Sequence, residues 1–85
     1  MTDADNEKAR MLAQSELTFY RSMLYAVEAT LDALQSLRYD LEQDNDAANA
    51  KAIALADDYI RHEQRRLKHW QDKTAAYRDI VNALS

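Results

Sequence analysis

Glycine and proline are both absent from this 85-residue chain, and their absence constrains the fold more than any other feature of the sequence. Tight turns, β-hairpins and β-bulges depend on these two residues, so a chain that lacks both is a poor candidate for a sheet protein. Alanine, leucine, glutamate, lysine and arginine are frequent instead, and these residues lose little free energy on entering a helix. The sequence therefore predicts an all-α fold.

Two segments carry apolar residues at alternating spacings of three and four, the repeat that packs one helix along another. The first stripe includes Ala13, Leu17, Tyr20, Leu24, Val27, Leu31, Leu34, Arg38 and Leu41. The second stripe consists of Ile53, Ala56, Ile60, Glu63, Leu67, Trp70, Thr74, Tyr77, Val81 and Leu84. Each segment is therefore expected to form a long helix with one buried face.

The most polar stretch of the chain, residues 42–46, separates the two segments. Its Asp and Asn side chains suit a turn, and the heptad register slips by one residue across it. We therefore predict one domain, 1–85: a helix at about 3–42 with Thr2 or Asp3 as N-cap, a turn at about 43–46 and a helix at about 46–84. The two helices should form an antiparallel, coiled-coil-like hairpin. The alternative is one unbroken helix, since the alanines that follow the turn are good helix formers.

A turn centred on residues 43–45 predicts which residues face each other across the hairpin. The expected neighbours are Leu34 with Ile53, Val27 with Ile60, Tyr20 with Leu67, Leu17 with Trp70, and Glu16 with Lys73.

Apolar residues outside the two stripes predict a protein partner, because a hairpin alone leaves them uncovered. On the first helix a second stripe combines small and large residues: Leu12, Ser15, Phe19, Ser22, Ala26, Ala29 and Ala33, bordered by Met11 and Tyr25. A second patch lies near the turn. The predicted partner-binding residues are Leu12, Phe19, Tyr25, Leu37, Leu55 and Tyr59. Dimerisation into a four-helix bundle would cover both patches, and docking of a different protein is the alternative. A solvated face would also explain the small residues.

Residues 61–73 form a basic band in a chain whose net charge is −4. Its candidate polyanion-binding residues are Arg61, Arg65, Arg66, Lys68 and Lys73. Such a band could neutralise the phosphates of nucleic acid. Because these cations point to several sides of one helix, a solvated face that complements the acidic half of the chain is the favoured interpretation, ahead of an acidic protein partner.

No pattern in the sequence indicates catalysis, a metal or a cofactor. His62 and His69 are about 10 Å apart along a helix, which is too far for joint metal ligation. Glu63 interrupts the apolar stripe and could act as an acid or base, but an ion pair with Arg21, Arg66 or Lys68 is favoured. We therefore expect a protein that is not an enzyme.

The function expected from these features is a cytoplasmic regulator or inhibitor that binds a partner protein. The acidic N-terminus is unlike a signal peptide, and the longest apolar runs are far too short to cross a membrane. The layout resembles the helical hairpins that dimerise into four-helix bundles in small plasmid and phage regulators, and the likeness is one of architecture. Two alternatives remain: a nucleic-acid-binding regulator, and a structural coiled-coil subunit about 130 Å long.

Overall fold

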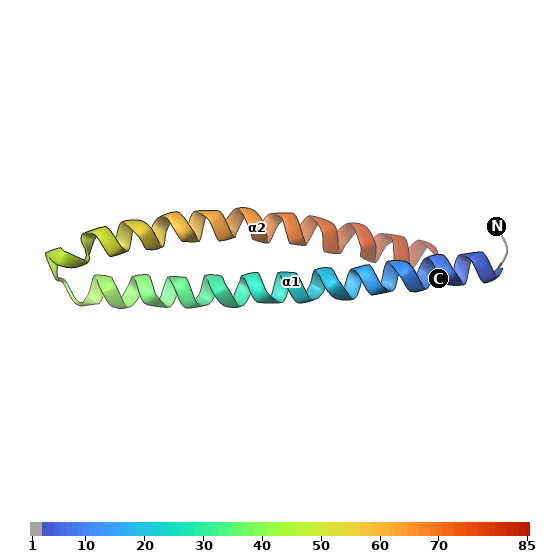
Figure 1. Ribbon diagram of the computed structural model, residues 1–85, viewed down its shortest axis with the longest axis horizontal. Coiled ribbons are helices and arrows are strands. Elements are labelled where there is room, and N and C mark those ends of the chain that lie inside the picture. Colours follow the sequence, from blue (N-terminus) through green and yellow to red (C-terminus); the bar gives the residue numbers. More distant parts are fainter. Residues whose placement is uncertain (1–2) are drawn as a thin grey trace.

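The protein is an antiparallel hairpin of two long helices. The computed structural model describes residues 3–85 and contains α1 (Asp3–Gln43), a short 3-10 helix η1 (Ala47–Asn49) and α2 (Ala50–Ala83). Figure 1 shows α1 and α2 side by side along almost their whole length. The predicted all-α hairpin is confirmed, and residues 3–85 contain no strand. The predicted N-cap Thr2 lies outside the described residues.

The two apolar stripes form the seam between the helices. The residues with the least exposed surface all belong to these stripes: Ala13, Leu17, Val27, Leu31, Ala56 and Glu63. Apolar residues spaced by three and four stay on one side of a helix, so each helix buries one face against the other. The acidic residues Asp3 and Asp5 in the first turn of α1 also stabilise the positive end of its helix dipole.

The turn is built by short polar side chains in place of glycine and proline. Asn45 adopts a left-handed conformation with φ 51° and ends α1, a role that glycine usually fills. The side-chain amide of Asn49 donates a 3.2 Å hydrogen bond to the Leu41 carbonyl, while the Asp46 carboxylate accepts a 2.9 Å bond from the Ala48 amide. The turn and η1 together occupy residues 44–49, so α2 begins later than the sequence analysis expected.

The predicted pairing of the two helices is wrong by about one heptad. The ring of Tyr20 was expected beside Leu67, but it lies 5.6 Å from Trp70 and 5.1 Å from Tyr77. Near the turn, Arg38 pairs with Asp57, and no described ion pair joins Glu16 to Lys73. The cause is the position of the turn. Moving the centre of a hairpin by about half a heptad moves every facing pair by about one heptad.

The hairpin is a thin rod of 66 × 14 × 13 Å. Its radius of gyration is 19.2 Å, whereas a compact domain of this length would have about 12 Å. The alternative of one continuous helix about 130 Å long is therefore wrong. The first turns of α1 project beyond the end of α2 (Figure 1). Neither described helix is apolar enough over a sufficient length to cross a lipid bilayer.

Candidate protein-binding flank

The two sides of the hairpin differ in chemistry. In heptad terms Leu17 and Ile53 are a positions, and a and d residues fill the seam. In an antiparallel pair, the c and g positions of both helices then line one side of the seam, and the b and e positions line the other. We call the c/g side the apolar flank, because six large apolar side chains lie on it. They are Leu12, Phe19, Leu37, Leu55, Tyr59 and Ile80.

The apolar flank holds most of the large apolar side chains that the described chain exposes. Nine such side chains are exposed among residues 3–85, and six of them are the members of the apolar flank. Their exposed fractions range from 43% for Ile80 to 62% for Leu12. The other three, Met11, Tyr25 and Tyr39, occupy b positions of α1, on the side that we call the charged flank.

Five of the six predicted partner-binding residues therefore share one side of the hairpin. The sixth, Tyr25, is 77% exposed and lies on the charged flank, separate from the others. Ile80 was not among the predicted residues. A signal for it exists in the sequence, because Ile80 lies three heptads after Tyr59 and so occupies the same heptad position.

A cluster of aromatic rings supports the apolar flank near the free ends of the helices. The Phe19 ring makes edge contacts with Tyr20 at 5.5 Å and with Trp70 at 6.4 Å, and His69 stacks edge-on against Trp70 at 4.8 Å. Burial raises the pKa of the Tyr20 hydroxyl, and the neighbouring Tyr77 and Glu16 raise it further. Phe19 is thus held against a packed cluster while half of its surface stays exposed, a state that lowers the entropic cost of binding.

A second group of apolar side chains lies on the same flank near the turn. Leu55 and Tyr59 are one helical turn apart and line a shallow depression together with Asp58 and His62. The contact between Arg38 and Asp57 shows the register of the two helices here, and in this register Leu37 is level with Leu55 and Tyr59. The flank therefore offers apolar surface at both ends of the rod.

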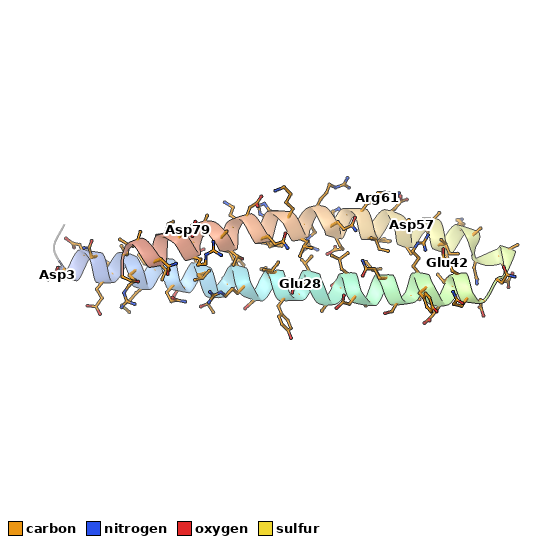
Figure 2. The ribbon with its side chains drawn as sticks, turned by 180° about the vertical axis from the view of Figure 1, so that it is seen from behind. Asp3, Glu28, Glu42, Asp57, Arg61 and Asp79 are labelled. Atoms are coloured by element: carbon orange, nitrogen blue, oxygen red, sulfur yellow. The ribbon has the colours of Figure 1, made fainter. Side chains whose placement is uncertain are left out.

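Acidic neighbours on the same helix neutralise much of the basic band. Arg61 pairs with Asp58, Arg66 with Glu63 at 3.0 Å, and Lys68 with Asp72 at 3.1 Å. Arg65 and Lys73 are the members of the band that make no ion pair within residues 3–85. In Figure 2, Arg61 lies on the side of α2 that is turned away from α1. The structure therefore does not gather the five candidate polyanion-binding residues into one cationic surface.

Arg38 is the main electrostatic link between the helices. Its guanidinium bonds to Asp57 on α2 and lies 2.7 Å from Glu42 one turn along α1. Figure 2 shows Glu42 and Asp57 on different helices near the same end of the rod. The hydrogen bond to Asp57, followed by the one to Glu42, raises the pKa of Arg38. This ion pair occupies the position where the apolar stripe of α1 is interrupted.

Glu63 interrupts the stripe of α2 in the same way. It is buried, and both of its carboxylate oxygens accept hydrogen bonds from Arg66, at 3.0 and 3.3 Å. The predicted ion pair at this position is confirmed. Elsewhere on α2, Asp58 and Asp72 are each engaged by a cation, and residues 3–85 contain no group of three or more His, Cys, Asp or Glu side chains placed to hold a metal ion.

No protein-family model, curated protein or solved structure matches this chain. The function is therefore argued from the geometry of the hairpin and from the contrast between its two flanks.

Proposed function

We propose that this chain is a protein–protein interaction module that acts as a regulator or inhibitor by docking a partner protein on its apolar flank. One observation carries the proposal: six of the nine large exposed apolar side chains gather on one side of both helices. Scattered apolar residues are normal on a protein surface, but large apolar side chains gathered on one side mark a site of association. The cysteine-free sequence suits a cytoplasmic setting for this module.

The expected gain from covering the flank is large for so small a protein. Full burial of one such side chain stabilises a complex by about 1.5–3 kcal/mol, so covering the exposed half of each gives about 1 kcal/mol per residue. Phe19 and Tyr59 are the expected anchors, because aromatic residues supply wide contact area at a low cost in side-chain entropy. An amphipathic helix or helix pair is the partner surface that fits a straight rod.

Nucleic-acid binding receives less support from the geometry. Binding to phosphates requires cations that are free to replace counterions, and three of the five candidates are already paired with carboxylates. We therefore place the interaction site on the apolar flank rather than on the basic band.

Photo-crosslinking in cells of the source organism tests the proposal. The photoreactive amino acid p-benzoylphenylalanine would replace Tyr59 on the apolar flank, and Tyr39 on the charged flank in a matched control. Tyr59 and Tyr39 are 60% and 61% exposed, so the photoreactive side chain would be equally accessible at either position. We expect covalent protein adducts from position 59 and few from position 39. Equal yields at the two positions, or no adduct at either, would overturn the proposal.

A further inference from the structure

We infer that the partner on the apolar flank is a second copy of this chain, packed face to face with both turns at the same end. Each α1 then lies along the α2 of the other copy, and the assembly is a four-helix bundle. This inference rests on the proposed function, because it names the occupant of the same flank.

The exposed area of the hairpin matches the need for such a dimer. The chain exposes 6247 Å², whereas a compact monomer of 9.8 kDa would expose about 5,200 Å². The excess is about 1,000 Å², and a stable protein–protein interface buries about 800 Å² on each partner. A second hairpin has the same length and straightness, so it can cover the whole flank.

The distribution of charge favours a copy of the chain over an unrelated partner. α1 carries eight acidic and four basic residues, which gives it a charge of −4. α2 carries five acidic and seven basic residues, which gives it +2. The chain is thus complementary to itself, and a two-fold dimer that sets α1 of each copy against α2 of the other uses this complementarity twice.

The same charges select the relative direction of the two hairpins. A face-to-face dimer with its turns at opposite ends would place α2 against α2. The middle of the apolar flank on α2 carries Lys73, which makes no ion pair within residues 3–85, Arg66, whose charge is partly offset by Glu63, and the imidazoles of His62 and His69. That arrangement would set two such groups against each other, and like charges in contact are unfavourable. With both turns at the same end, these residues face α1 instead.

Side-chain sizes also fit the arrangement with both turns at one end. In this arrangement a residue of α1 lies beside the same stretch of α2 twice, once in its own chain and once in the other copy. The contacts of Tyr20 and Arg38 then place Phe19 of one copy within a turn of Ala76 of the other. By the same register Ala33 comes within a turn of Tyr59. Large side chains opposite small ones allow two helices to approach closely.

Sedimentation equilibrium with matched variants tests whether the chain pairs with itself. We expect the wild type to have about twice the chain mass of 9.8 kDa at micromolar concentration. The double variant Leu37→Glu/Tyr59→Glu should weaken dimerisation at least 100-fold, while Tyr25→Glu/Tyr39→Glu on the charged flank should leave it unchanged. A wild-type monomer at 100 µM, or equal effects of the two double variants, would overturn the inference.

A distance measurement on the dimer tests the arrangement without relying on a destabilising variant. The chain has no cysteine, so Ala47→Cys at the exposed start of η1 provides a single site for a nitroxide label. Pulsed electron spin resonance should give a separation of about 20 Å when both turns lie at one end, given helix spacings of about 10 Å. A separation near the 66 Å length of the rod would overturn the arrangement.

Failure of this inference can be told apart from failure of the proposed function. A monomeric chain that still forms adducts with a different protein through position 59, and not through position 39, overturns self-association and leaves the protein-binding function intact. A chain that is monomeric and forms no position-specific adduct overturns both.

Discussion

Asn45 is the one residue among 3–85 that has a positive φ. Its φ of 51° is left-handed, a conformation that costs most residues about 1–2 kcal/mol and glycine almost nothing. We expect Asn45→Gly to preserve or slightly raise the free energy of unfolding and Asn45→Val to lower it by about 1–2 kcal/mol. Urea unfolding followed by circular dichroism measures both. Ser36→Val, on an exposed part of α1, controls for the effect of a β-branched residue. If it lowered the free energy of unfolding as much as Asn45→Val, the left-handed conformation of Asn45 would not be the cause.

Tyr20 should make the stability of the hairpin depend on alkaline pH. Its pKa is raised in the folded chain, mainly by burial, so the folded state holds the hydroxyl proton more tightly than the unfolded state. The stabilisation is present below the unfolded pKa of about 10 and is lost as pH rises through the folded pKa. Between pH 9 and pH 11.5, we expect the urea midpoint to fall less for Tyr20→Phe than for the wild type. The exposed Tyr25→Phe is the control and should follow the wild type.

Glu63 and Arg66 should respond in opposite ways to apolar replacement. Glu63 is buried in the seam, whereas the Arg66 side chain remains 43% exposed. Glu63→Leu completes the apolar stripe, and we expect it to raise the free energy of unfolding by about 1 kcal/mol. Arg66→Met leaves a buried carboxylate without its cation and should lower the same quantity by about 1–2 kcal/mol. Thermal unfolding of the two variants shows whether each raises or lowers the free energy of unfolding. Stabilisation by both would show that the hairpin does not need this ion pair for its stability.

The turn is the element that decides how the two helices meet. Asn49 donates its side-chain amide to the Leu41 carbonyl, one of the groups that α1 leaves without a helical partner. Asn49→Ala should lower the free energy of unfolding by about 1 kcal/mol through loss of this bond. Asn49 is also the N-cap of α2, so Asn49→Asp removes the donor but places a negative charge at the positive start of that helix, and its cost should be no greater than that of Asn49→Ala. Unfolding in urea measures both variants, and an unchanged free energy of unfolding for Asn49→Ala would contradict this role.

At the scale of the element, the sequence predicts the helices and the seam but not the pairing between them. The apolar stripes identify Leu17, Val27 and Ala56 as buried because their spacing depends on one helix at a time. The pairing depends on both helices. If one helix is shifted by seven residues along the other, the same heptad positions still face each other, so the stripes do not distinguish the two pairings. The structure of residues 44–49 removes this ambiguity, and their contribution comes from individual hydrogen bonds that periodicity does not report.

The candidate site was predictable only in part, because it too depends on how the two helices pair. The sequence identified Leu12 and Phe19 as apolar residues outside the seam, and both are exposed in the hairpin. It grouped them with a stripe of small residues on the same helix. Their place on one side with Leu37, Leu55 and Tyr59 emerges only when the two helices are set antiparallel, because the apolar flank takes residues from both.

At the scale of the whole molecule, a hairpin that is completed by a second copy should become more stable as its concentration rises. Unfolding of a dimer yields two chains, so each tenfold rise in concentration favours the folded dimer by about 1.4 kcal/mol. For about 170 residues unfolding together, the enthalpy is about 120 kcal/mol, and the Tm should increase by about 4 °C per tenfold rise.

Calorimetry between 10 µM and 1 mM measures this slope without any label or substitution. The flank variant Leu37→Glu/Tyr59→Glu should show a lower Tm that hardly changes with concentration, because a separate hairpin unfolds in a unimolecular step. Tyr25→Glu/Tyr39→Glu should retain the wild-type slope. A wild-type Tm that stays constant over this range would mean that the rod is stable alone, and that its exposed apolar flank serves a different protein.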